Sequence, residues 1–220
     1  MSIVIVGAGP NLGMAIARRF GREGLAVGLT SRNQEKLEGL VAELTELTDS
    51  GITAAAAAAD IRDPAALAAA IQTLASQLGP VEILEYSPVP AGEFMKPILE
   101  TTAEDLRGPL EVSVFGAATA VHTVLEPMRN AGHGTILFTT GTAFITRNPQ
   151  RAGVGVSFSG EVAYAEMLHK ALADEGIHVA HTAIHGAIGP GKQFEPDAVA
   201  DILWQHHTTR QGFQTRLGIE

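Results

Sequence analysis

The chain has 220 residues, 45% of them hydrophobic, and carries a formal net charge of −9 at pH 7. That length and apolar content are enough for the core of one α/β domain, so we expect a single domain. The acidic charge excludes nucleic acid and anionic membrane surfaces as expected partners, because both favour a basic protein surface.

Further classes of protein are excluded by composition. Cysteine is absent, which rules out disulfides, thiol catalysis and cysteine-bound metals. The eight histidines form no HExxH pattern, and His206 and His207 are adjacent and cannot share a helix face, so we expect no metal site. No apolar run approaches the roughly 18 residues of a membrane span, and the chain opens on a strand without a basic leader. We therefore expect a soluble, cytoplasmic protein.

The first element is an apolar strand over residues 2–6, which runs into Gly7-Ala8-Gly9-Pro10-Asn11-Leu12-Gly13 and then into a helix. A strand that breaks at glycines and restarts as a helix lets backbone N–H groups approach a pyrophosphate, with the positive end of the helix dipole behind them. The last glycine comes one residue later than in Gly-x-Gly-x-x-Gly, and a plain tight strand-to-helix connection is the alternative. The segment predicts a dinucleotide site.

Strand and helix patterns alternate through the rest of the chain. Start and stop signals support them, such as Asp63-Pro64 before an alanine-rich helix and Gly79-Pro80 after it. Such alternation predicts an α/β fold, a Rossmann-like doubly wound parallel sheet in a three-layer αβα domain, with a short C-terminal tail from about residue 208. The expected strands are 2–6, 25–29, 52–58, 81–86, 134–140 and 177–184, and the expected helices are 12–23, 33–48, 64–78, 102–130 (interrupted near Gly108-Pro109), 156–175 and 196–207.

These landmarks, in this order, resemble the short-chain dehydrogenase/reductase family over nearly the whole chain. Gly7 and Gly13 match the outer glycines of the family's Gly-x-x-x-Gly-x-Gly turn, and Asn11 replaces the middle one as a residue that tolerates a left-handed backbone. Residues 134–140 and 172–179 match the fifth strand and the run into the sixth. Residues 176–181 and 186–188, with an altered tyrosine motif, are similar to a divergent subgroup of this family. The resemblance implies a nicotinamide-dependent oxidoreductase.

The resemblance also implies which cofactor is bound. In NADP-type members a hydroxyl and a guanidinium after the second strand receive the 2′-phosphate; Ser31 and Arg32 match them, and no carboxylate occupies 28–33. A solvated arginine at a helix start is the alternative. Asp60 and Ile61 match the family's adenine contact, for which a helix-start acid is the alternative. We expect NADP(H) to be preferred over NAD(H).

The catalytic pair of the family is not found in this sequence. Family members use Tyr-x-x-x-Lys on one helix face, and these positions fall on Phe158 and Val162, neither of which can donate a proton. The expected replacements are His185 and Tyr86, at the ends of the sixth and fourth strands, and Thr140, whose hydroxyl could orient a substrate. A structural or exposed role is the alternative for the histidine, and a packing role for the tyrosine.

Four residues of the helix over 156–175 are not expected to be catalytic. Tyr164 turns to a different side of that helix, and Glu161, His169 and Lys170 are expected to be solvated. The expected cofactor-binding set is Gly7, Gly9, Pro10, Asn11, Leu12, Gly13, Ser31, Arg32, Asp60, Ile61, Ser87, Pro88, Thr140, Phe158, His185, Gly186 and Ile188.

The leading hypothesis is an atypical NADP(H)-dependent oxidoreductase that transfers hydride to or from a small carbonyl, imine or enone. A non-catalytic NADP(H)-binding or structural protein of the same fold is the alternative, and an enzyme whose substrate supplies its own acid is a third possibility. Family members commonly pair through their fourth and fifth helices, so a homodimer or homotetramer is expected. The family's seventh strand is expected to be reduced or absent.

Overall fold

A seven-stranded sheet forms the centre of the protein. The computed structural model describes residues 1–46 and 51–219. Within them the strand order is β3-β2-β1-β4-β5-β6-β7, and every neighbouring pair is parallel. The order reverses between β1 and β4, where doubly wound sheets place their ligands. The strands are β1 (Ser2–Val6), β2 (Ala26–Thr30), β3 (Ala54–Ala56), β4 (Val81–Tyr86), β5 (Gly134–Gly141), β6 (Ile177–Ile184) and β7 (Gln214–Leu217).

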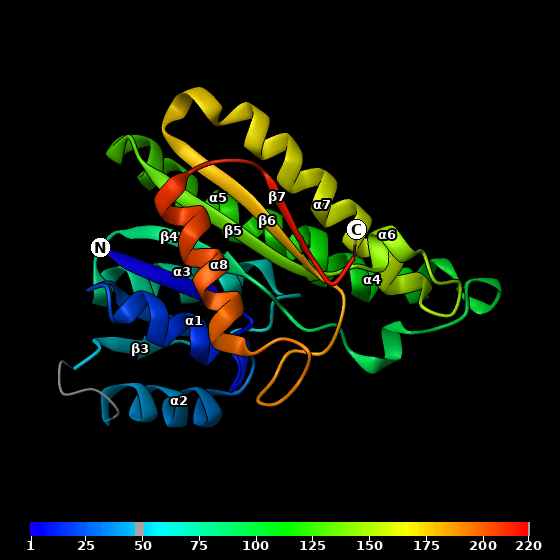
Figure 1. Cartoon of the computed structure of the whole chain (residues 1–220), viewed down its shortest axis with the longest axis horizontal. Helices are drawn as coiled ribbons and strands as arrows, with labels where there is room; N and C mark the ends of the chain where they lie inside the picture. The colour runs from blue at the N-terminus through cyan, green and yellow to red at the C-terminus, as the bar shows by residue number, and fades with distance from the viewer. Residues whose placement is uncertain (47–50, 220) are drawn as a thin grey trace.

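Helices cover both faces of this sheet, which confirms the predicted three-layer α/β fold (Figure 1). Alternate residues of β1 divide between two cores: Ile3 and Ile5 pack on the side of α1, α2 and α8, whereas Val4 and Val6 pack on the side of α3, α5 and α7. This is the arrangement that a strand buried on both faces requires. The helices are α1 (Leu12–Gly21), α2 (Gln34–Glu46), α3 (Pro64–Leu78), α4 (Ala103–Leu110), α5 (Gly116–Ala131), α6 (Ala143–Thr146), α7 (Ala152–Ala171) and α8 (Pro196–Thr209).

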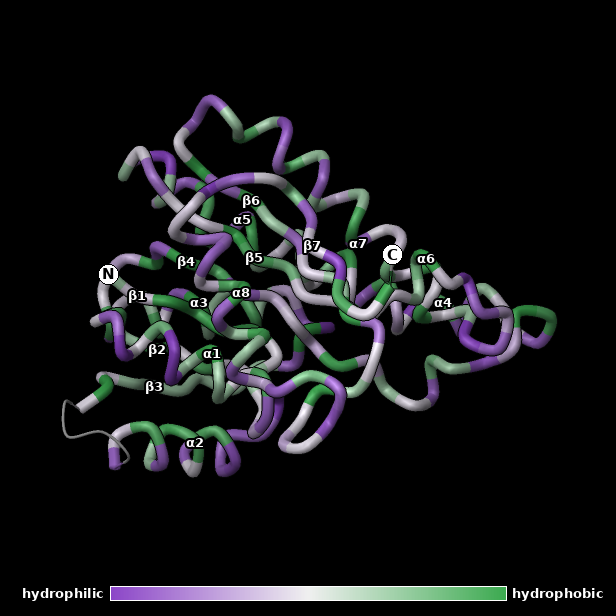
Figure 2. Tube along the Cα trace, viewed as in Figure 1, coloured by the Kyte–Doolittle hydropathy of each residue, from purple (hydrophilic) through white to green (hydrophobic). Residues whose placement is uncertain are grey.

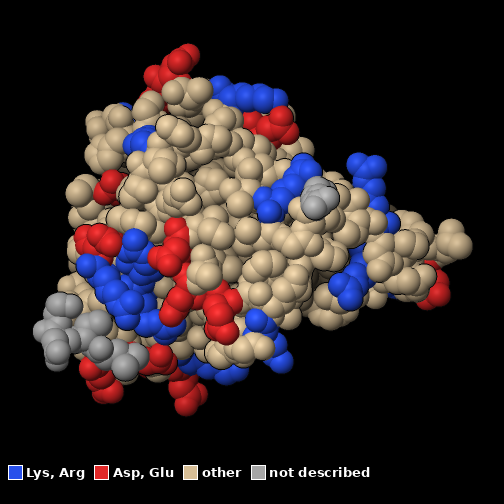
Figure 3. All heavy atoms as spheres, in the orientation of Figure 1, with Lys and Arg blue, Asp and Glu red and all other residues tan. Residues whose placement is uncertain are grey.

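Polarity separates the inside of the molecule from its outside. Figure 2 shows hydrophobic residues along the central strands and hydrophilic residues on the outer turns of the helices. Basic and acidic side chains lie side by side on the face that carries α1 and α8 (Figure 3), where Arg18 pairs with Asp197 at 3.2 Å and Arg19 with Asp201 at 2.7 Å. Exposed pairs of this kind contribute little to stability, so the two apolar layers hold the fold together.

Several elements differ from the sequence-based expectation. The strand expected over 52–58 is reduced to β3, and the helix expected over 102–130 is divided into α4 and α5 by a π-helical turn, Glu111–Phe115. Helix α7 starts four residues before the expected 156 and ends at Ala171, and the short α6 was not predicted. Residues 47 and 48 of the expected second helix lie outside the described residues.

The C-terminal segment is more ordered than the expected tail. Helix α8 continues to Thr209, and β7 adds a four-residue parallel strand beside β6. The polar sequence Gln214-Thr215-Arg216-Leu217 has no apolar run, and at the sheet edge its backbone pairing with β6 supplies the structure instead. The seventh strand is thus short but present. Among the described residues, no helix combines the length and apolar character needed to cross a lipid bilayer.

Candidate cofactor and active site

The glycine-rich turn lies at the point where β1 ends and α1 begins. Gly7 has φ +94°, and a Cβ atom there would lie 2.7 Å from the Pro88 backbone, so only glycine fits. Gly9 has open space around its Cα. The first helical N–H groups of α1 have no intrahelical acceptors, and Asn11 places no side-chain cap on them. Asn11 has φ −94°, so the left-handed backbone expected of it is not used. The N–H groups of Gly7 and Ala8 donate to the Thr30 carbonyl and that of Met14 to the Gly9 carbonyl. The N–H groups of Leu12 and Gly13, at the start of α1, are the ones that the turn offers to an anion.

A cleft of about 340 Å³ lies against this turn, above the carboxyl ends of β4, β5 and β6. Most of the expected cofactor residues meet there, although they come from distant parts of the sequence. A dinucleotide phosphate and the ring beyond it would find glycine backbone on one wall and apolar side chains on the other. The expected residues that line it are Gly7, Gly9, Pro10, Asn11, Leu12, Gly13, Ser87, Pro88, Thr140, Phe158, Gly186 and Ile188.

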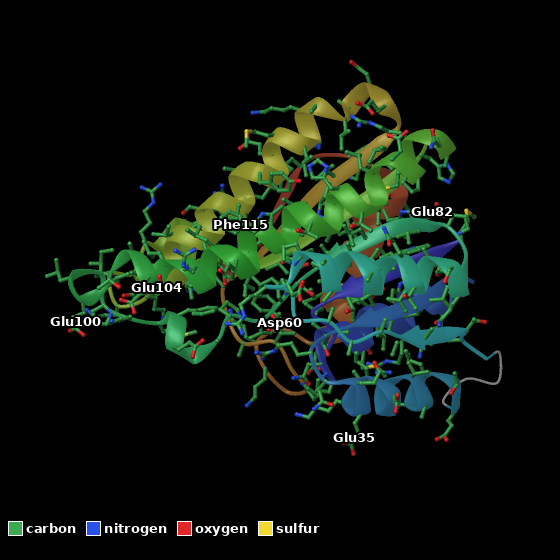
Figure 4. The ribbon with its side chains drawn as sticks, turned by 180° about the vertical axis from the view of Figure 1, so that it is seen from behind. Glu35, Asp60, Glu82, Glu100, Glu104 and Phe115 are labelled. Atoms are coloured by element: carbon green, nitrogen blue, oxygen red, sulfur yellow. The ribbon has the colours of Figure 1, made fainter. Side chains whose placement is uncertain are left out.

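A second pocket of about 290 Å³ continues from the same turn and contains Ser31, Arg32, Asp60 and Ile61 as expected. Arg62, which the sequence reading did not single out, also lines it and pairs with Asp60 at 3.2 Å. Hydrogen bonds from Arg62 lower the pKa of the Asp60 carboxyl. Figure 4 shows Asp60 between the strands and the α4–α5 segment. Arg32 is exposed and forms no ion pair with any described residue, so its guanidinium is available to a ligand.

The end of the cleft away from the glycine turn is lined by an apolar side chain of α7. Phe158 lines the cleft and contacts the position where Gly141 ends β5. Val162, the expected lysine position, is buried and lines neither this cleft nor its neighbour. Val154, one turn before Phe158, shares the neighbouring pocket with it instead. The helix face toward the cleft therefore carries no acid or base at either position.

His185 lies beyond this cleft, in a wider adjoining pocket of about 960 Å³. Its Nδ1 lies 2.7 Å from the Thr142 hydroxyl, and the residue is exposed to solvent. Phe158, Ile184 and Gly186 belong to both spaces, so the two join. His185 therefore lines the wider pocket and not the cleft against the glycine turn, where it was expected among the cofactor residues.

Tyr86 is not a cleft residue, which corrects its expected catalytic role. Its side chain is fully buried, and its hydroxyl donates to the Val112 carbonyl in the π-helical turn. Burial raises the pKa of Tyr86 well above its ordinary value, with a smaller contribution from Glu161. The apolar strand position at 86 faces the core because side chains alternate along β4. Tyr164 also packs inward, with its ring edge-on to Phe138 at 6.5 Å.

Thr140 combines contact with the cleft and a fixed hydroxyl. It is 5% exposed, and its Oγ1 donates to the Gly141 carbonyl at 2.9 Å and lies 2.8 Å from His181 Nε2. The other ring nitrogen of His181 lies 3.0 Å from the Gln214 amide nitrogen of β7. Burial lowers the pKa of His181 to about 4, so the ring is neutral, with Nε2–H donating to Thr140 and Nδ1 accepting from Gln214.

Two carboxyl groups are buried beside this end of the cleft, and both were missed. Glu161 is 1% exposed, which contradicts its expected solvation; burial and then the nearby Glu85 raise its pKa well above the ordinary range. Helix α7 packs against β6 and the π-helical turn, and position 161 lies on this packed side of the helix. Lys170 is exposed as expected and pairs with Glu166 at 2.7 Å, whereas His169 is half-buried against the Val179 carbonyl.

Glu85 is fully buried at the end of β4, where the Thr139 and Ser87 hydroxyls donate to it at 3.1 and 2.8 Å. Burial raises its pKa to about 8. The strand β4 carries two glutamates, Glu82 and Glu85, and nothing in its sequence marks Glu85 as the fully buried one.

Comparison with known proteins gives a consistent picture. The sequence profile described as short chain dehydrogenase matches residues 1–188. The chain is 28% identical over 174 residues to a 2-dehydro-3-deoxy-L-rhamnonate dehydrogenase (NAD(+)) from a Sphingomonas species, covering 79% of this chain and 67% of that protein.

Solved structures have the same architecture. A short-chain dehydrogenase from Rhodopseudomonas palustris superposes with a TM-score of 0.86 and 28% identity, over 100% of this chain and 98% of that one. An NADPH-bound short chain oxidoreductase from Pseudomonas aeruginosa, described as containing an atypical catalytic center, superposes with a TM-score of 0.88 at 15% identity, over 100% of this chain and 96% of that one.

Proposed function

The chain belongs to the short-chain dehydrogenase family and is an NAD(P)-dependent oxidoreductase, and from that premise we propose that it prefers NADP(H) and transfers hydride to or from a small carbonyl, imine or enone. The observation that carries the cofactor preference is the free Arg32 guanidinium beside Ser31, in a pocket whose one aspartate is already paired with Arg62. A planar guanidinium suits a 2′-phosphate. The NAD(+)-named Sphingomonas relative makes this preference a point to test.

Different residues of the chain would bind different parts of the cofactor. A bound nicotinamide would supply the hydride. The glycine turn and the first turn of α1 would hold the pyrophosphate, and Asp60 with Ile61 would flank the adenine. Phe158 and Ile188 would exclude water from the nicotinamide end.

Substrate positioning falls to the hydroxyl groups and the histidine of the wider pocket. We assign Thr140, held by His181, to orienting the reacting oxygen, and His185, held by Thr142, to substrate contact. The Pseudomonas aeruginosa neighbour, with its atypical catalytic center, supports a working site of this fold without the usual arrangement. The naming of relatives as dehydrogenases favours an enzyme over a non-catalytic scaffold.

We also propose a cytoplasmic homodimer or homotetramer that assembles through α4, α5 and α7. Large apolar side chains are exposed on α7 and on the π-helical turn between α4 and α5: Val156 is 41% exposed, Met167 62% and Phe115 55%. Figure 4 shows Phe115 on the outer side of the α4–α5 segment. Light scattering should give a mass of two or four chains; a monomer at micromolar concentration would contradict the proposal.

The cofactor proposal is tested by fluorescence titration with NADPH and NADH, using Arg32→Ala and the control Arg22→Ala. Arg22 is also exposed but lies away from both cofactor pockets. Loss of a charge-assisted bond should weaken NADPH binding roughly 10- to 100-fold, with little change for NADH and no change in the control. Equal losses for both cofactors would refute the NADP(H) preference. NADPH binding without turnover of any aldehyde, ketone, imine or enone would indicate the scaffold instead.

A further inference from the structure

The buried carboxyl of Glu85 is hydrogen-bonded to two hydroxyl groups in the wall of the nicotinamide cleft. Its Oε2 accepts from the Ser87 hydroxyl at 2.8 Å and its Oε1 from the Thr139 hydroxyl at 3.1 Å. Both hydroxyl residues line the cleft, whereas the carboxyl itself is fully buried. A buried acid thus touches the cofactor space only through two hydroxyl groups.

The protonation state of this acid sets which way those hydroxyls point. An ionised carboxylate only accepts, so it takes both hydroxyl hydrogens and leaves lone pairs toward the cleft. A protonated carboxyl must donate its own hydrogen to one of the two hydroxyl oxygens. That hydroxyl can then turn its hydrogen to the cleft, and the proton becomes available there without movement of Glu85.

We propose that Glu85 is a buried proton reservoir that acts through the Ser87 hydroxyl to supply, and to recover, the proton that accompanies hydride transfer. This inference rests on the proposed function. Ser87 is assigned as the conduit because it makes the shorter contact and is half-buried, whereas Thr139 is 7% exposed. Glu85 is therefore a positioning residue that substitutes for an acid on α7, where Val154 and Phe158 are apolar.

In carbonyl reduction, the substrate carbon accepts the hydride that a reduced nicotinamide supplies, and the carbonyl π pair moves to oxygen. That oxygen takes the Ser87 hydroxyl proton while the Ser87 oxygen takes the carboxyl proton of Glu85. The carbonyl is reduced to an alcohol, the nicotinamide is oxidised, and Glu85 is left as a carboxylate. Water returns the proton through the same hydroxyl after product leaves, and alcohol oxidation follows the reverse path.

The surroundings keep this proton in place near neutral pH. The paired residues on β1 and β5 are apolar, and burial raises the pKa of Glu85 to about 8. Titratable groups on the adjacent elements are the buried Glu161 on α7, Tyr86 on β4, His178 and His181 on β6 and His206 on α8, together with the half-buried Glu82 on β4 and His207 on α8. Burial raises the pKa of Glu161 and that of Tyr86, and it lowers the pKa of His178 and that of His181 to about 4, so burial favours the neutral form of each.

The first test is infrared titration of the free protein, with Glu85→Gln and the matched control Glu161→Gln at equal depth on α7. A protonated-carboxyl C=O band should disappear with a midpoint near pH 8 in the wild type and in the control, and be missing in Glu85→Gln. Ser87→Ala and Thr139→Ala should each raise the midpoint, because each removes a hydrogen bond to the carboxylate. No band titrating above pH 7 would overturn the proposal.

The second test is the pH profile of single-turnover NADPH oxidation by a ketone or aldehyde. The wild-type rate should fall above about pH 8. Glu85→Gln and Ser87→Ala should lose that inflection and roughly 100-fold in rate. Glu161→Gln should keep the inflection, and Thr139→Ala should keep it at a higher pH. An unchanged inflection in Glu85→Gln overturns the relay alone, and its loss in Thr139→Ala but not Ser87→Ala overturns the assignment of Ser87. NADPH binding without turnover in the wild type contradicts the proposed function and the relay together.

Discussion

The two halves of the cofactor cleft differ in which groups they retain. The adenine half, at the ends of β1, β2 and β3, keeps the glycine turn, a free arginine and a paired aspartate. The half that we assign to the nicotinamide, built by β5, β6 and α7, carries the apolar side chains of Phe158 and Val162 on α7 and the buried Glu85 at the end of β4. Because the halves rest on different elements, substitution in one leaves the other standing. Cofactor binding and proton transfer can thus diverge separately in one fold.

The largest expected effect is a pH-dependent change in the free energy of unfolding, and it comes from Glu85 beside the nicotinamide half of the cleft. Folded Glu85 has a pKa near 8 against an ordinary 4.5, so between these pH values the folded chain holds a proton that the unfolded chain has released. Its contribution to the free energy of unfolding is full below pH 4.5, declines as pH rises, and is lost above 8. The total is on the order of 5 kcal/mol, since one pKa unit corresponds to about 1.4 kcal/mol.

Glu85→Gln stays neutral and should not share this decline. Urea unfolding at pH 5, 7 and 9 measures it as the difference between variant and wild type, which cancels the parallel decline from Glu161. A constant difference across the three pH values would show that Glu85 is already ionised in the folded protein, and would weaken the contrast between the halves.

The next largest effect bears on the turn that both halves share. Gly7→Val should weaken NADPH and NADH binding alike, by roughly 100-fold or about 2.7 kcal/mol, because a side chain at φ +94° is strained and would meet the Pro88 backbone. Gly39→Val, at an open position in α2, is the control. Calorimetric titration with both cofactors measures the change, and selective loss of one cofactor would contradict the role of the turn in holding the shared pyrophosphate.

The smallest expected effect is the loss of stability in Tyr86→Phe, which tests whether Tyr86 has a packing role or a catalytic role. Tyr86→Phe removes the hydroxyl that donates to Val112 and should cost about 1 kcal/mol of stability. NADPH affinity should not change, because Tyr86 lines neither half of the cleft. Thermal unfolding and cofactor titration of the same preparation make the comparison. If turnover were lost while stability stayed the same, Tyr86 would return to the catalytic groups.

The sequence predicts the parallel α/β fold and the cofactor wall because these depend on local patterns: apolar strands, and glycines where strand becomes helix. It misses the interior of the nicotinamide half, which depends on how helices rotate against the sheet. Glu161 is predicted as solvated but is buried, and Tyr86 is predicted in the cleft but packs in the core. Glu85 accepts from Ser87, two residues along the chain, but also from Thr139 of β5, which is 54 residues away in sequence. Short edge elements such as β7 owe their form to a neighbouring strand and carry little local pattern.

The π-helical turn Glu111–Phe115 acts as a change of phase in an otherwise continuous helical run. An added residue in one turn rotates everything after it, so the inward face of α4 cannot be extended by counting to α5. It also leaves the Val112 carbonyl free to accept from Tyr86, and it brings Gly116 so close that a Cβ atom would lie 2.5 Å from the Tyr86 hydroxyl oxygen. Deleting one residue from this turn would rotate α5 as a whole against the sheet, and its buried face would no longer fit the core that it forms with β4.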